Sequence, residues 1–325
     1  MSSKSIVLWA PSLSPGYGKP TAYDAANRNL SAIGVSTMWA PWARRALADS
    51  SKDLFDSMSI DSRIRDLTWA LTQETSILLC AIGGYNAYQL LDSIDWSALK
   101  RKGATLVGHS DFTVLANAYY AKTGMVSWYG PNFRNFGDSD TGLMSVDNFV
   151  ATLSQARTEW RSQRVYKNSF KSQVKKSAGW YAIRAGNASG IGIGGNVGTF
   201  FLLQGTQYMP KFNQPTILFL EEDEMPGVYA IREFDRKLRS ILDQPGAQEQ
   251  IKGLVIGRFL DETKTTRTMI KEVIDSIPFF DDKPVIANVE IGHGMPRIML
   301  PIGGKIQISA PDKKIVVYNP LTGVL

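Results

Sequence analysis

The chain contains very little cysteine and histidine for its length. Among 325 residues there is one cysteine, Cys80, and there are two histidines, His109 and His293. A single thiol cannot form a disulfide within the chain, and Cys80 lies in the apolar run 77–82, where we expect a small buried side chain. Zinc sites are mostly built from several Cys and His ligands. We therefore expect no disulfide framework, no metal centre and no organic cofactor.

Long apolar runs are also lacking. No stretch reaches the roughly 20 apolar residues that cross a bilayer, and residues 6–10 are too short for the core of a signal peptide. We therefore expect a cytoplasmic protein that does not enter a membrane. The net charge of +6 permits an anionic ligand. However, the glycine-rich stretch 190–199 lacks the lysine of a phosphate loop, and no motif for binding a nucleic-acid polymer accompanies the charge.

Strand and helix patterns alternate along the chain. Apolar runs at 6–10, 77–82 and 104–107 end in glycine, proline or polar residues, and segments of helical spacing separate them. This alternation favours a mostly parallel sheet with right-handed crossovers. We predict an α/β fold with a Rossmann-like parallel-sheet N-terminal domain at 1–150 and a smaller mixed α/β C-terminal domain at 189–325.

A connector or lid is expected between these domains, at 151–188. Residues 149–160 have helical spacing, and residues 157–176 carry seven basic side chains with Trp160, Tyr166 and Phe170 between them. Such a run is typical of a solvated amphipathic face. It would also suit an aromatic and cationic lid over an anionic substrate.

Ser110 occupies a turn that could present a nucleophile. The apolar run 104–107 meets Gly108, and helical spacing begins at Phe112, so the pattern is strand, tight turn, helix. The serine hydroxyl would project over the sheet edge, with the amide of Asp111 directed at the same space. An ordinary capped turn would have the same composition, since the second glycine of a nucleophile elbow is replaced by Phe112.

A serine nucleophile needs a base and a group that orients the base. His293 lies between two glycines directly after an apolar strand pattern, and Glu221 follows the apolar run 215–220. His109 is adjacent to the serine, and neighbouring side chains on such a turn diverge, so we do not expect it to be the base. Ser110, His293 and Glu221 are therefore a candidate triad. A structural histidine and a solvated acidic cluster are the alternative interpretation.

Several segments together resemble one known family. They are Gly83-Gly-Tyr-Asn86, Gly108-His-Ser-Asp111, Tyr129-Gly-Pro131, Gly194-Gly-Asn196, Leu220-Glu221, Gly257-Arg-Phe259, Asn288 to His293 and Pro301-Ile-Gly-Gly304. In this order they resemble the LD-carboxypeptidase family of serine peptidases, closest to its microcin C immunity branch, and the similarity runs from about Ile6 to Gly304. The histidine at position 109 departs from the family, in which Tyr or Phe is usual.

The resemblance implies roles for individual residues. Ser110 would be the nucleophile, His293 the base and Glu221 its partner. The amides of Gly84 and Asp111 would form the oxyanion hole. The family also implies a homodimer.

The predicted function is hydrolysis of a carboxamide in a peptidyl- or aminoacyl-nucleotide of microcin C type, which would give self-immunity or detoxification. Tyr85, Asn86 and Trp180 are candidate substrate-binding residues, with Trp160 and Phe170 as further stacking candidates. One alternative is a carboxypeptidase that removes the terminal D-residue from muropeptide tetrapeptides. A binding protein that sequesters a peptide or nucleotide in the same crevice is the non-enzymatic alternative.

Overall fold

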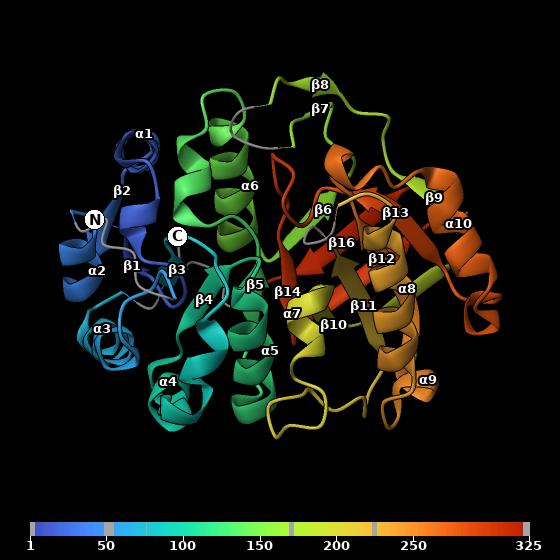
Figure 1. Ribbon diagram of the computed structural model, residues 1–325, viewed down its shortest axis with the longest axis horizontal. Coiled ribbons are helices and arrows are strands. Elements are labelled where there is room, and N and C mark those ends of the chain that lie inside the picture. The colour runs from blue at the N-terminus through green and yellow to red at the C-terminus, as the bar shows by residue number, and fades with distance from the viewer. Residues whose placement is uncertain (1–3, 49–54, 76, 169–171, 223–225, 321–325) are drawn as a thin grey trace.

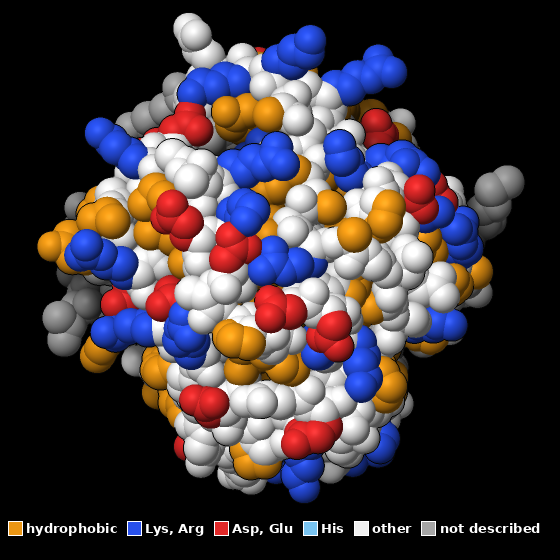
Figure 2. Space-filling view, turned by 90° about the vertical axis from the view of Figure 1, so that its right-hand side faces the viewer, with side chains coloured by type: hydrophobic (Ala, Val, Ile, Leu, Met, Phe, Trp, Pro, Cys, Tyr) orange, Lys and Arg blue, Asp and Glu red, His pale blue; other side chains and the backbone are white. Residues whose placement is uncertain are grey.

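Two β-sheets of different size organise the computed structural model, which describes residues 4–48, 55–75, 77–168, 172–222 and 226–320. Figure 1 shows the smaller sheet, with α1 to α5, in one half of the molecule and the larger sheet, with α8 and α10, in the other. On the outer face of this second half, basic and acidic side chains are mixed over the surface (Figure 2). Phe170, one of the connector aromatics, lies outside the described residues. The mixed α/β architecture with a parallel sheet in the N-terminal half confirms the predicted fold class.

The smaller sheet has the strand order β14-β5-β4-β3-β1-β2. Its strands are β1 (Lys4–Trp9), β2 (Val35–Trp39), β3 (Ile77–Cys80), β4 (Thr105–Gly108), β5 (Ser127–Tyr129) and β14 (Leu300–Ile302). All pairs from β5 to β2 are parallel, whereas β14, which comes from the C-terminal half, pairs with β5 antiparallel. Every residue of β3 and β4 is buried, as expected for central strands of a parallel sheet covered on both faces.

The larger sheet is mixed and has the order β6-β16-β15-β10-β11-β12-β13-β9. Its strands are β6 (Arg157–Trp160), β9 (Tyr181–Arg184), β10 (Asn187–Asn196), β11 (Thr216–Glu221), β12 (Ile251–Gly257), β13 (Val285–Val289), β15 (Lys305–Ser309) and β16 (Lys314–Tyr318). The central strands β10 to β13 are parallel, and the outer strands are antiparallel. A short hairpin of β7 (Val165–Tyr166) and β8 (Lys175–Lys176) forms a separate sheet.

The helices follow the predicted pattern with one correction. They are α1 (Pro20–Ser31), α2 (Pro41–Ala46), α3 (Ile60–Thr72), α4 (Trp96–Lys102), α5 (Phe112–Thr123), α6 (Gly142–Ser154), α7 (Val197–Phe201), α8 (Tyr229–Leu242), α9 (Ala247–Gln250) and α10 (Arg267–Asp275). Helical spacing at 149–160 was misleading beyond residue 154, because α6 ends at Ser154 and β6 pairs with β16. The segment predicted as a connector therefore contributes β6 and β9, two edge strands, to the larger sheet. The domain boundaries themselves stay a prediction.

Helix α5 lies at the junction of the two halves. It contacts β4 and β5 of the smaller sheet and also β10 and α7 of the larger half. Its residues are buried on nearly every side, from Phe112 to Tyr119. A helix that is apolar around its whole circumference is stable only when it is surrounded. The turn at the start of α5 is therefore held between both sheets.

Candidate active site

Ser110 lies on a sharp turn between β4 and α5. Its backbone has φ +64°, a left-handed conformation that is unusual for a residue other than glycine. Gly108 allows this turn to pack closely, because a Cβ there would lie 2.8 Å from Cγ of Phe112 and 2.9 Å from Cβ of Cys80. Strain of this kind persists only where the surrounding structure fixes the backbone. The geometry matches the nucleophile elbow that the sequence suggested.

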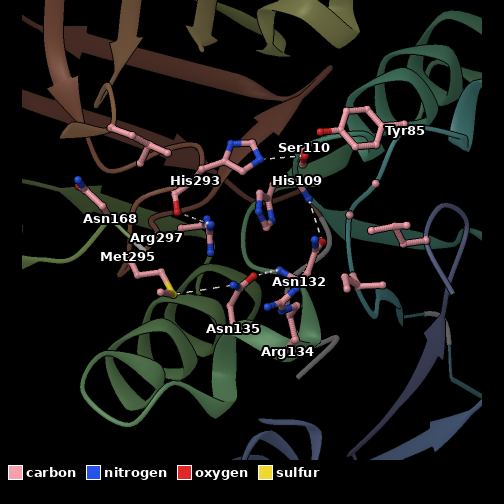
Figure 3. A pocket seen from close by; sticks show the side chains of 15 residues that line it. Tyr85, His109, Ser110, Asn132, Arg134, Asn135, Asn168, His293, Met295 and Arg297 are labelled. Atoms are coloured by element: carbon pink, nitrogen blue, oxygen red, sulfur yellow. Dashed lines mark hydrogen bonds between the residues drawn. The ribbon is translucent and has the colours of Figure 1, made fainter. Parts of the chain in front are cut away.

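The structure brings Ser110, His293 and Glu221 together. The Ser110 hydroxyl oxygen lies 2.9 Å from Nε2 of His293, and Nδ1 of His293 lies 3.1 Å from Oε2 of Glu221. Figure 3 shows the first of these contacts, with the imidazole directed at the serine. Glu221 ends β11 and is fully buried, whereas His293 lies in the loop after β13. With a proton on Nδ1, the imidazole donates to Glu221 and can accept the serine proton at Nε2.

The loop that carries His293 is fixed from two sides. Gly292 has φ +92°, and a Cβ there would lie 2.5 Å from Oε2 of Glu221, so a side chain at this position would displace the carboxylate. Arg297 is buried and donates to the carbonyl of Gly292 and, at 2.9 Å, to the carbonyl of His293. The base is therefore held in place by its backbone as well as by its side chain.

Tyr129 connects Ser110 to the Glu221 carboxylate, a role that no sequence pattern predicts. Its hydroxyl donates to Oε1 of Glu221 at 2.7 Å and accepts from the backbone N–H of Ser110 at 3.1 Å. In the sequence, the Tyr129-Gly-Pro131 segment contributes only to the family resemblance. No spacing rule could have joined a residue at the end of β5 to β11 across 92 positions.

Gly84 and Asp111, the predicted oxyanion donors, lie on the two turns beside Ser110. An ideal Cβ on Gly83 would lie 3.1 Å from Cβ of Ser110, which places the diglycine directly against the nucleophile. Gly84 has φ +147°, and a Cβ there would come within 2.7 Å of the backbone nitrogen of Leu13. Within the described part of the chain, no hydrogen-bond acceptor is found for the backbone N–H of either Gly84 or Asp111. Both amides can therefore serve an anion that forms at this point.

The Asp111 side chain has a separate structural task. Its carboxylate accepts hydrogen bonds from the Ser12 hydroxyl and, at 2.7 Å, from the backbone N–H of Ala87. Burial raises the pKa of Asp111, and these hydrogen bonds lower it, with a net rise. The carboxylate thus ties the serine turn to the two loops that follow β1 and β3.

Of the three predicted substrate-binding residues, the structure places only Tyr85 at the pocket. Tyr85 is 77% exposed and stands at the rim, beside Ser110 in Figure 3. The Asn86 side chain instead donates to the carbonyl of Phe55, and Asn86 is not among the residues that line the pocket. Its amide is occupied in holding the neighbouring loop, which corrects the prediction for this residue.

Trp180 is buried in this structure, and its role in substrate binding stays a prediction. It is 2% exposed, its indole N–H donates to Oε2 of Glu290, and it does not line the pocket that contains Ser110. The same Glu290 accepts from Arg258 at 2.8 Å. Trp160 is likewise buried, and its indole N–H donates to the carbonyl of Met299. Both indoles therefore donate hydrogen bonds within the fold, and both lie outside the pocket in front of Ser110.

The pocket in front of Ser110 has a volume of about 360 Å³. His109 lines it, is 5% exposed and has its ring 5.3 Å from the ring of His293. Burial, together with the positive charges of Arg297, His293 and Arg134, holds the pKa of His109 well below its usual range. His109 is therefore a neutral wall residue, and His293 is the histidine in contact with the serine.

Two further structural observations concern metals and membranes. Among the described residues, no group of three or more His, Cys, Asp and Glu side chains is arranged to hold a metal ion. Within the same ranges, every helix is too short or too polar to cross a bilayer.

Comparisons with known proteins identify two family domains in the chain. The LD-carboxypeptidase N-terminal domain matches residues 6–130, and the LD-carboxypeptidase C-terminal domain matches residues 189–308. Together these matches contain Ser110, Glu221 and His293, so the residues that meet in space come from both family domains.

Individual relatives extend over most of the chain. A protein of Treponema pallidum is 32% identical over 97% of this chain and 93% of its own length. The Microcin C7 self-immunity protein MccF of Escherichia coli is 24% identical over 82% of this chain and 80% of its own, and the murein tetrapeptide carboxypeptidase of Pseudomonas aeruginosa is 23% identical over 75% and 76%.

Solved structures agree with the sequence comparisons. The MccF-like protein from Bacillus anthracis superimposes with a TM-score of 0.91 at 32% identity, covering 98% of both chains. Structures of MccF itself share the fold, with a TM-score of 0.85 at 19% identity. Since both domains match and relatives above 30% identity align over nearly the whole length, the chain belongs to the LD-carboxypeptidase family and is a serine hydrolase.

Proposed function

We propose that this enzyme is a serine peptidase that hydrolyses the carboxamide of a peptidyl- or aminoacyl-nucleotide of microcin C type, using Ser110, His293 and Glu221. The observation that carries the proposal is the continuous contact from the Ser110 hydroxyl through both imidazole nitrogens of His293 to the Glu221 carboxylate. MccF, a relative of this chain, has been solved with aspartyl sulfamoyl adenosine bound, which supports this substrate class.

The reaction begins when Nε2 of His293 takes the Ser110 proton and the serine oxygen attacks the carbonyl carbon. The backbone N–H groups of Gly84 and Asp111 stabilise the oxyanion of the tetrahedral intermediate. The intermediate collapses as the imidazolium gives its proton to the leaving nitrogen, so an acyl-enzyme forms and the amine-side product departs. Water, deprotonated by His293, then releases the acyl group, and Glu221 stabilises the imidazolium in both halves.

The proposal is tested first by covalent labelling. A serine-directed fluorophosphonate should add one label to the intact protein, and a Ser110→Ala variant should remain unmodified in mass spectrometry. A protein that binds the nucleotide substrate tightly but takes no label would instead be a sequestering protein, and the peptidase proposal would be wrong.

Removal of the terminal D-residue from muropeptide tetrapeptides is a second candidate function. It is favoured by the relative named murein tetrapeptide carboxypeptidase, at 23% identity. Incubation of the enzyme with aspartyl sulfamoyl adenosine and, separately, with a muropeptide tetrapeptide separates the two by product. The proposal also includes a cytoplasmic homodimer, which light scattering and cell fractionation would check.

A further inference from the structure

The pocket in front of Ser110 has a positively charged wall. Arg134, from the 3₁₀ turn Phe133–Gly137, and Arg297, from the loop after His293, both line it. None of its fifteen lining residues, all within the described part of the chain, is an Asp or Glu. In the view of Figure 3, both arginine side chains reach the region around His109, below the serine. The wall thus offers two cations and no carboxylate.

The positive charges of these arginines act on the same residue, His109. Burial first, and then the charges of Arg297, His293 and Arg134, lower the pKa of His109, which lies between them and the nucleophile. Burial also lowers the pKa of Arg134. A guanidinium withdrawn from water is stabilised by a ligand of opposite charge, so the wall favours an anion over a neutral group.

The wall is also held in position before any ligand arrives. Arg297 donates hydrogen bonds to two backbone carbonyls, those of Gly292 and His293, and these bonds hold its guanidinium in place. Asn132 accepts from the backbone N–H of His109 at 3.1 Å, and its amide nitrogen would lie 3.6 Å from a Cβ on Gly83. A donor therefore stands between the guanidinium groups and the diglycine turn. A fixed site of this kind binds with little loss of conformational freedom.

We infer that this wall binds a carboxylate that the substrate carries close to the scissile carboxamide, through Arg134 and Arg297. Guanidinium groups suit this ligand because they can donate two parallel hydrogen bonds to its two oxygens. The inference rests on the proposed function for the position of the reacting bond. The carboxylate has two possible sources: the α-carboxylate of a C-terminal residue, as in a muropeptide, or the side chain of an acidic aminoacyl group.

The test compares substrates that differ only in this charge. One pair is a tetrapeptide with a free C-terminal D-alanine and the same peptide as its C-terminal amide. The other pair is aspartyl and asparaginyl sulfamoyl adenosine. Wild type is compared with Arg134→Gln, Arg134→Lys and Arg101→Gln, the last an exposed arginine on α4 whose side chain is 71% exposed. Thermal unfolding of each variant shows that it is folded.

We expect the ratio of kcat/KM for the charged over the neutral substrate to fall by about 10-fold or more in Arg134→Gln, as the loss of a charge-assisted hydrogen bond predicts. Arg134→Lys should restore part of the ratio, and Arg101→Gln should leave it unchanged. A response in the peptide pair alone identifies the C-terminal carboxylate, and a response in the nucleotide pair alone identifies the acidic side chain. An unchanged ratio in both pairs would overturn the inference.

A binding measurement keeps the inference separate from the peptidase proposal. N-acetyl-D-alanine and N-acetyl-aspartate are titrated against wild type and Arg134→Gln, each beside its amide. If wild type cleaves neither substrate pair, the peptidase proposal fails, whereas a preference of wild type for an acid over its amide that is lost in Arg134→Gln still supports the carboxylate site. Equal affinity of wild type for acids and amides contradicts the site whatever the enzyme cleaves.

Discussion

Replacement of Tyr129 by phenylalanine removes one oxygen atom that contacts two parts of the proposed catalytic machinery. The hydroxyl donates to Glu221 at 2.7 Å and accepts from the Ser110 N–H at 3.1 Å, and the tyrosine is 1% exposed. Phenylalanine keeps the ring and its packing, so the change is confined to these hydrogen bonds. Tyr129 is not among the residues that line the pocket. We therefore expect kcat to fall while KM stays close to its wild-type value.

The magnitude follows from the charge of the acceptor. A hydrogen bond to a charged group contributes about 1.5–3 kcal/mol, and roughly 1.4 kcal/mol corresponds to a factor of ten in rate. If this hydrogen bond is needed to hold Glu221 against His293 in the transition state, its loss decreases kcat roughly 10- to 100-fold.

The assay is steady-state hydrolysis across pH, with unfolding in urea measured in parallel. Tyr119→Phe is the matched control, because the Tyr119 hydroxyl is equally buried but donates to the backbone carbonyl of Ala104, at 2.9 Å. It should cost about 1 kcal/mol of unfolding free energy and leave kcat unchanged. If Tyr129→Phe keeps kcat within a factor of two of wild type, the role given to this hydroxyl is wrong.

Two further variants probe the site. Since burial and nearby cations lower the pKa of His109, only the unfolded chain takes up a proton there as pH falls below about 6.5, and native stability decreases. His109→Phe should remove this decrease in the free energy of unfolding, as measured by urea titrations at several pH values. The fall of activity at low pH should remain, because the proposed base is His293, and its disappearance would contradict that assignment. Gly292→Ala should lower kcat roughly 100-fold by displacing Glu221, whereas Gly34→Ala, with φ +76° and open space around it, should cost only about 1–2 kcal/mol of unfolding free energy; similar activity in both variants would refute the clash.

The fold was predictable where local pattern and tertiary structure agree. The buried strands β3 and β4 and the amphipathic helix α8 carry apolar spacing that fixes their type. The strand β6 lacked such a signal, because its identity depends on pairing with β16, for example Trp160 with Ile315. The central strand β10 was also not predictable, because it is rich in glycine, which is uncommon in strands. Its glycines are explained by close packing, since a Cβ on Gly194 would lie 1.9 Å from the carbonyl oxygen of Phe219.

The site was predictable in its chemistry and less so in its surroundings. A chain with two histidines leaves few candidates for a base, so Ser110, His293 and Glu221 could be proposed from residue type and the resemblance. The family resemblance, and no local pattern, made Trp180 a candidate for stacking. In the structure its indole N–H donates to Glu290, which lies 110 positions away. Contacts at that separation follow from the fold and leave no local pattern.

The strand exchange by β14 has a consequence for how the molecule could be divided. Leu300–Ile302 closes the edge of the N-terminal sheet, although it belongs to the C-terminal half of the chain. A gene cut between the halves would yield an N-terminal fragment with a bare hydrogen-bonding edge at β5, which invites aggregation. The same short strand follows the His293 loop, so its pairing with β5 attaches this loop to the sheet from which the Ser110 turn emerges. A circular permutation that moves β14 to another place in the chain should therefore be tolerated only if β14 can still pair with β5.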